Sequence, residues 1–136
     1  MTDPAEPSIL VVDDDRNMRG LICKALAGNG YGTAEASNGK EALSYLRSSP
    51  RRPLLILLDL MMPEMTGWEF RKVQQGDPAL SGIPVAIITG LEVPEGQLRE
   101  IGAVDVLCKP SRVEPLVSLV SRFCGAPAKS RKDRNV

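Results

Sequence analysis

Short apolar runs alternate along the chain with segments whose hydrophobic residues recur at helical spacing. The runs at 8–12, 54–59 and 84–89 are nearly unbroken, which is typical of parallel strands buried on both faces. Two weaker strands are predicted at 32–37 and 104–108. The intervening segments place apolar residues three and four positions apart, which predicts helices around 18–26, at 38–49, at 67–75, at 95–101 and from 113 onward.

This alternation predicts an α/β fold, a doubly wound parallel (βα)5 sheet with right-handed crossovers and helices on both faces. In such folds, ligands bind beyond the carboxyl ends of the strands. One domain over 8–124 accounts for the pattern, with flexible ends at 1–7 and 125–136, the second of them basic. The first and last helices should each carry an apolar face, formed by Met18, Leu21, Ile22, Ala25 and Leu26 in the first and by Val113, Leu116, Val117 and Val120 in the last.

The composition fits a cytoplasmic domain without a nucleic-acid or membrane partner. The 136 residues are 43% hydrophobic, which is enough for one packed core. Lys plus Arg number 17 and Asp plus Glu number 17, and this zero net charge argues against nucleic acid or an anionic membrane as the main partner. The apolar runs are far shorter than the roughly 20 residues that cross a bilayer, and the first residues carry no signal pattern.

The absence of histidine narrows the chemistry. The chain lacks the commonest general base, the commonest metal ligand and any Ser/His or Cys/His pair. Cys23, Cys108 and Cys124 form no CxxC pair and are odd in number, so we interpret them as reduced thiols, two of them on apolar faces. Carboxylates, hydroxyls and lysine remain as the reactive groups.

Acids, a hydroxyl and an ammonium group follow the predicted strands. Asp13 and Asp14 end the first strand, Asp59 the third and Thr89 the fourth, and Lys109 follows the fifth. Carboxylates about 4 Å apart repel by roughly 4 kcal/mol per pair at an effective dielectric constant near 20. A divalent cation would offset this repulsion, and oxygen ligands without histidine or thiolate favour Mg²⁺ or Mn²⁺.

Each of these residues also has an ordinary structural role. Asp59 alone could form a turn or cap a helix, Thr89 could be a strand-end hydroxyl, and Lys109 could be a solvated loop lysine. Asp15 differs from its two acidic neighbours, because it directly precedes the first helix and is predicted to be its N-cap. The joint placement of the others at one sheet edge favours chemistry.

With these residues located, the sequence resembles the receiver domain of two-component response regulators. The stretches "ILVVDDD", "LLDLMMPEMTGWE", "IIT" and "CKP" match the family's motifs in order and at close to its spacing, over roughly 8–124. The resemblance implies the flavodoxin-like strand order 2-1-3-4-5, in which the first and third strands are neighbours. The acids would then converge at one crevice.

The resemblance also implies roles at named positions. Asp59 would accept a phosphoryl group from a sensor histidine kinase or histidine phosphotransfer protein, forming an aspartyl phosphate. Asp13, Asp14 and Asp59, with the backbone carbonyl of Met61, would hold Mg²⁺. Lys109 would neutralise phosphoryl charge.

The remaining implied roles concern the switch and its decay. Thr89 would hydrogen-bond a phosphoryl oxygen and pull the following loop along. The chain would thus catalyse its own phosphorylation and, since Met61 offers no group to orient an attacking water, only slow dephosphorylation.

Two departures from the family pattern affect the output. Val106 stands where the family usually has Tyr or Phe, and the segment between Thr89 and Lys109 predicts a short fourth helix. We therefore expect a monomer whose output goes to an unidentified partner through another surface. An alternative is a phosphorylation-independent interaction module. A carboxylate-nucleophile phosphatase is disfavoured, because such enzymes carry a second acid where this chain has Met61.

Overall fold

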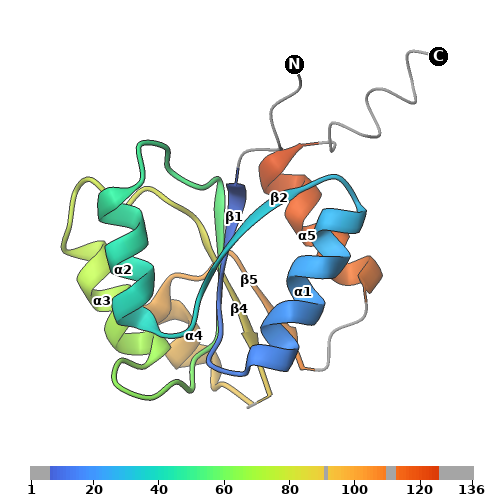
Figure 1. The fold of residues 1–136 in the computed structure, drawn as a ribbon. Helices are drawn as coiled ribbons and strands as arrows, with labels where there is room; N and C mark the ends of the chain where they lie inside the picture. The colour runs from blue at the N-terminus through green and yellow to red at the C-terminus, as the bar shows by residue number, and fades with distance from the viewer. Residues whose placement is uncertain (1–6, 91, 110–112, 126–136) are drawn as a thin grey trace.

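Five strands and five helices alternate along the described chain, which comprises residues 7–90, 92–109 and 113–125 of a computed structural model (Figure 1). The predicted flexible ends fall almost wholly outside these residues. The elements are β1 (Pro7–Val12), α1 (Arg16–Gly28), β2 (Gly32–Ala36), α2 (Gly39–Ser48), β3 (Leu55–Leu58), α3 (Gly67–Gln75), β4 (Val85–Thr89), α4 (Glu95–Ile101), β5 (Asp105–Cys108) and α5 (Val113–Cys124).

The strands form one parallel sheet in the order β2-β1-β3-β4-β5. This confirms the predicted fold and strand order. Every residue of β3 and β4 is buried, whereas β5 at the edge is partly exposed. The burial explains the sequence pattern, because central parallel strands covered on both faces need continuous apolar runs and edge strands do not.

Helices α1 and α5 cover one face of the sheet, and α2, α3 and α4 cover the other (Figure 1). One buried cluster includes Leu46, Phe70 and Ile101 from the three-helix side. The second includes Leu26 and Val120 from the two-helix side. Since all strands are parallel, their carboxyl ends lie at one edge of the sheet.

Most of the helix predictions are confirmed. Asp15 is the N-cap of α1, its carboxylate accepting from the backbone N–H groups of Asn17 and Met18. Helix α4 is short, at seven residues, and lacks a side-chain cap. Two residues of the predicted apolar faces are exposed, Leu21 at 63% and Val113 at 50%, because both line an open hollow between α1 and α5.

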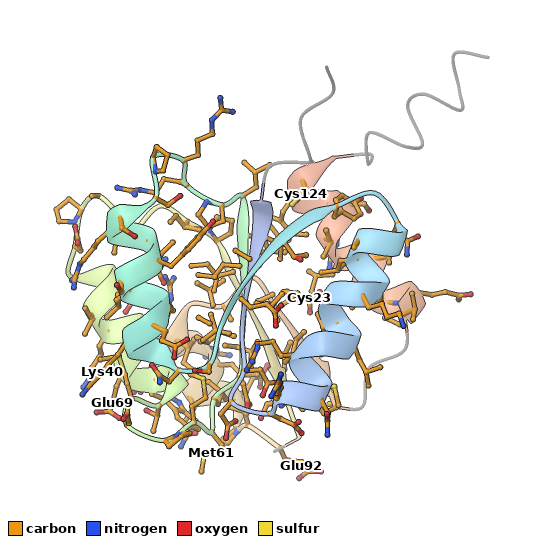
Figure 2. All side chains as sticks on the ribbon, viewed as in Figure 1. Cys23, Lys40, Met61, Glu69, Glu92 and Cys124 are labelled. Atoms are coloured by element: carbon orange, nitrogen blue, oxygen red, sulfur yellow. The ribbon has the colours of Figure 1, made fainter. Side chains whose placement is uncertain are left out.

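The three cysteines are free thiols, as predicted. Cys23 is buried between the sheet and α1, and Cys124 is half-buried at the end of the molecule opposite Met61 (Figure 2). Burial raises the pKa of the Cys124 thiol to about 11, so this thiol is un-ionised at neutral pH. Among the described residues, no helix combines the length and apolar character that a membrane crossing requires.

Candidate functional site

Three carboxylates converge at the carboxyl edge of the sheet. One oxygen from each of Asp13, Asp14 and Asp59 lies within 4.8 Å of the other two. The pairing of β1 with β3 brings Asp13 and Asp59 together, since Val12 is the register partner of Leu58 and an aspartate directly follows each of these residues. The backbone N–H of Asp59 continues the ladder by donating to the Val12 carbonyl at 2.9 Å.

Lys109 reaches into this cluster from the end of β5. Its Nζ lies 2.7 Å from Oδ2 of Asp13 and 3.2 Å from Oδ2 of Asp59. The backbone N–H of Lys109 donates to the Thr89 carbonyl at 2.8 Å, which holds the base of the lysine against the end of β4. One ammonium group thus neutralises part of the charge of two carboxylates from other strands. Pro110, which follows it, lies outside the described residues.

Burial and charge act in opposite directions at Asp59. The residue is 5% exposed, and this burial raises its pKa above the ordinary value of 3.8. The charge of Lys109 opposes that rise, and the negative charge of Asp13 adds to it. For Lys109, burial alone would lower the pKa, but the hydrogen bond to Asp13 and the charge of Asp59 outweigh it, so the pKa is raised.

The donor set fits a hard divalent cation. Asp13 is 2% exposed, and apart from its ion pair with Lys109 its buried Oδ2 has no hydrogen-bond partner among the described residues. Its Oδ1 accepts from the backbone N–H of Asp15 at 2.9 Å. Asp14 is exposed, which leaves its carboxylate open to a hydrated ion. Carboxylates that keep access to water are the ligands that Mg²⁺ takes.

The loop after β3 wraps tightly around the cluster. The backbone N–H of Met61 donates to Oδ1 of Asp59 at 3.4 Å, and the side chain of Met61 is 54% exposed. Figure 2 places Met61 and Glu92 at this end of the molecule. A Cβ at position 67 would lie only 2.6 Å from the Asp59 carbonyl oxygen, so the glycine there is needed for the loop to return past the acid.

Thr89 and Val106 complete the neighbourhood of the site. Thr89 is buried at the last position of β4, where it pairs with Cys108 of β5. Because β4 lies between β3 and β5, Thr89 at its end lies between the strand that Asp59 follows and the strand that Lys109 follows. Val106 packs against the core cluster on the side of α2, α3 and α4. The position that the family usually fills with an aromatic ring is therefore a partly buried valine at the edge of this cluster.

Sequence reasoning missed two residues that border the cluster. Nη1 of Arg19 on α1 donates to the backbone carbonyl of Asp13 at 2.7 Å, and its Nε donates to Oε1 of Glu35 on β2 at 2.9 Å. The only signal in the sequence was a cation on the first turns of α1 and an acid on a neighbouring strand. Connecting either position to Asp13 requires the strand order and the direction of both side chains.

The chain also matches known proteins over most of its length. A family model described as the response regulator receiver domain matches residues 9–121. The chain belongs to the response regulator receiver family. The chain is 37% identical over 122 residues to the DNA-binding response regulator MtrA of Mycobacterium bovis, covering 87% of the chain and 50% of MtrA. It therefore spans about half the length of that relative.

Other receiver proteins resemble the chain over more of their own length. The two-component response regulator ORR11 of Oryza sativa subsp. indica is 38% identical over 120 residues, which cover 87% of the chain and 81% of ORR11. The structure of Vibrio cholerae chemotaxis protein CheY4 superimposes with a TM-score of 0.78 at 30% identity, covering 88% of the chain and 99% of CheY4. The signal receiver domain of a Syntrophus aciditrophicus signal transduction histidine kinase gives 0.76 at 36% identity, covering 87% and 89%.

Proposed function

We propose that this receiver domain is a phosphoacceptor switch that takes a phosphoryl group onto Asp59 in a Mg²⁺-dependent reaction. The observation that carries the proposal is the cluster of three carboxylates with Lys109 bridging two of them. A buried, partly neutralised carboxylate beside a cation site has the groups that phosphoryl transfer requires, since that reaction depends mainly on positioning and charge stabilisation.

In the proposed reaction, an oxygen of the Asp59 carboxylate attacks the phosphorus of a phosphohistidine. An O–P bond forms, the P–N bond breaks, and the leaving imidazole takes up a proton. The 136 residues contain no histidine, so the phosphohistidine lies outside them, and we propose that its bearer is a sensor histidine kinase or a histidine phosphotransfer protein. Lys109, already 3.2 Å from Asp59, would donate to a phosphoryl oxygen.

The cation site would be formed by Asp13, Asp14 and Asp59 with the backbone carbonyl of Met61. Bound Mg²⁺ would neutralise negative charge that builds up between the carboxylates and the phosphoryl oxygens. Mn²⁺ has similar ligand preferences and could replace it. Thr89 would donate its hydroxyl proton to a phosphoryl oxygen and draw the start of the β4–α4 loop toward the site.

Intact-mass measurement after incubation with a small acyl phosphate tests the acceptor. With Mg²⁺ we expect a species about 80 Da heavier, the mass of one phosphoryl group. The heavier species should be absent in Asp59→Asn and absent when EDTA removes the metal. Asp77→Asn is the matched control, because Asp77 lies away from the cluster and its carboxylate contacts Arg47 at 3.9 Å and the Ala79 N–H at 3.0 Å, a bond that asparagine can also accept.

The phosphorylated state should be long-lived. Met61 is exposed beside Asp59 but carries no group that could orient a water molecule for attack. We propose a half-life well beyond seconds, to be measured as the decay of the heavier species after the donor is removed. Decay within seconds would contradict this proposal.

Two observations disfavour an output signal that passes through position 106 and α4, as is usual in the family. Val106 is a valine packed partly buried against the core cluster, and α4 has only seven residues. We propose that the domain stays monomeric and signals to a protein partner through a different surface, without contact to nucleic acid or membrane. Sedimentation with and without beryllofluoride and Mg²⁺ tests this; tight dimerisation on activation would overturn it.

The same two observations favour an alternative, an interaction module that works without phosphorylation. The mass experiment separates the two functions. A wild-type chain that gains no mass with any acyl or amido phosphate, although it is folded and has Mg²⁺, would support the alternative. Phosphorylation at Asp59 would support the switch.

A further inference from the structure

We propose that Arg19, oriented by Glu35, is the positioning residue that holds Asp14 in place for a divalent cation. The inference rests on the proposed cation site and assigns a task to two residues outside the four stretches that carry the resemblance. It concerns one peptide unit, the one that joins Asp13 to Asp14.

Arg19 fixes that peptide unit by a short hydrogen bond. Its Nη1 lies 2.7 Å from the Asp13 carbonyl oxygen, in a side chain that is only 15% exposed. The atoms from the Asp13 carbonyl to the Cα of Asp14 lie in one plane, since the peptide bond has partial double-bond character. A donor that holds the carbonyl oxygen therefore also fixes where the backbone N and Cα of Asp14 lie, and so the point from which its side chain starts.

Of the two peptide units that flank Asp14, Arg19 holds one, and the N–H of Asp15 holds the other by donating to Oδ1 of Asp13. The side chain of Asp14 is exposed and makes no hydrogen bond to any described residue. Asp13, by contrast, is held at three further points, through its N–H to the Ala36 carbonyl, its Oδ1 to Asp15 and its Oδ2 to Lys109. Loss of Arg19 should therefore release Asp14 more than Asp13.

Glu35 has two effects on Arg19. Its Oε1 accepts from Nε at 2.9 Å, which turns the guanidinium so that Nη1 faces the β1–α1 loop. Its negative charge also offsets a positive charge that would otherwise lie beside a bound cation. An arginine suits this task, because its planar fork can donate to two acceptors at once in a fixed geometry.

Magnesium titration followed by the fluorescence of Trp68, the single tryptophan, tests the inference. Arg19→Gln should raise the Mg²⁺ dissociation constant by roughly tenfold, the effect usually seen when a residue supporting a metal ligand is lost. Arg16→Gln is the matched control, because it removes the same charge from the same helix at an exposed residue that makes no hydrogen bond to the described residues of the β1–α1 loop. We expect its Mg²⁺ dissociation constant to stay within about twofold of the wild-type value, well below the tenfold change expected for Arg19→Gln.

Glu35→Gln provides a second variant, at the exposed position of β2. It keeps a side chain that can still accept from Arg19 but leaves the guanidinium charge unbalanced. We expect weaker Mg²⁺ binding at low salt and recovery toward the wild-type value as salt is added. In Arg19→Gln, added salt should give no such recovery, and saturating Mg²⁺ should restore the rate of phosphorylation.

The outcomes distinguish this inference from the proposed function. A wild type that neither binds Mg²⁺ nor is phosphorylated would overturn the proposed function, and this inference with it. A wild type that does both, beside an Arg19→Gln variant with an unchanged dissociation constant, would overturn only the inference. An Arg19→Gln variant whose phosphorylation stays impaired at saturating Mg²⁺ would also overturn the inference, because Arg19 would then stabilise the domain in general rather than position Asp14 for the cation.

Discussion

The ammonium group of Lys109 lies 3.2 Å from Oδ2 of Asp59, although the two residues are 50 positions apart in the chain. The same ammonium lies 2.7 Å from Oδ2 of Asp13. Its side chain is 17% exposed, so these contacts are shielded from water and are stronger than those of a surface pair. Lys109 therefore stabilises the cation-free domain as well as serving the proposed chemistry.

Replacing Lys109 by Met should destabilise the domain in EDTA at pH 7 by roughly 2 to 3 kcal/mol, because two buried carboxylates lose their counter-charge. The pKa of Lys109 is raised by folding, so its contribution to stability is present below the ordinary value of 10.5 and is lost as pH rises through the folded value. Urea unfolding between pH 7 and pH 11 measures both effects. A wild-type stability that does not fall toward the variant's at high pH would contradict the assignment.

Asp59→Asn should stabilise the cation-free domain at pH 7 by on the order of 1 kcal/mol. Burial raises the pKa of Asp59 above 3.8, so the ionised carboxylate costs stability, and this cost grows as pH rises from 3.8 through the folded pKa. The difference between variant and wild type should vanish near pH 3, where both folded and unfolded carboxyls are protonated. Thermal unfolding in EDTA at pH 3 and pH 7 measures it, and a less stable Asn variant at pH 7 would disprove the argument.

The neighbouring acids Asp14 and Asp15 should behave differently. Asp15→Ala removes the N-cap of α1 and should lower the free energy of unfolding by about 1 kcal/mol, with little change in Mg²⁺ affinity. Asp14→Ala should leave stability in EDTA nearly unchanged but abolish measurable Mg²⁺ binding and block phosphorylation. Each variant controls the other in urea unfolding and Mg²⁺ titration. If the two variants lowered both the free energy of unfolding and the Mg²⁺ affinity to the same extent, Asp14 and Asp15 would not have the separate roles of metal ligand and helix cap.

The loop after Asp59 contains a residue in a left-handed conformation. Glu64 has φ of 66°, and among the described residues it is the non-glycine residue with positive φ. Asparagine tolerates this region better than glutamate, so Glu64→Asn should raise the free energy of unfolding by about 0.5 kcal/mol. Glu64→Ala is the control, since it keeps the Cβ and the strain while losing the 3.3 Å bond from Asn38. An Asn variant no more stable than the Ala variant would disprove the strain.

The motifs of the first and third strands can be interpreted from local sequence alone. The buried residues of β1 and β3 form unbroken apolar runs, and acids directly after parallel strands lie at one edge of the sheet. Leu21 and Val113 show the limit of this reasoning. Their spacing fits an apolar helix face, but exposure depends on which neighbouring element reaches that face, and the periodicity of one helix does not contain that information.

The sequence by itself determined the α/β class, the positions of the strands and the residues that end them, because these depend on local hydrophobic periodicity. Only the tertiary structure decided how those ends are connected: Lys109 between Asp13 and Asp59, and Arg19 between the Asp13 carbonyl and Glu35. These contacts join residues far apart in the chain, so they depend on strand order and side-chain direction. Both are set by the packing of the whole domain.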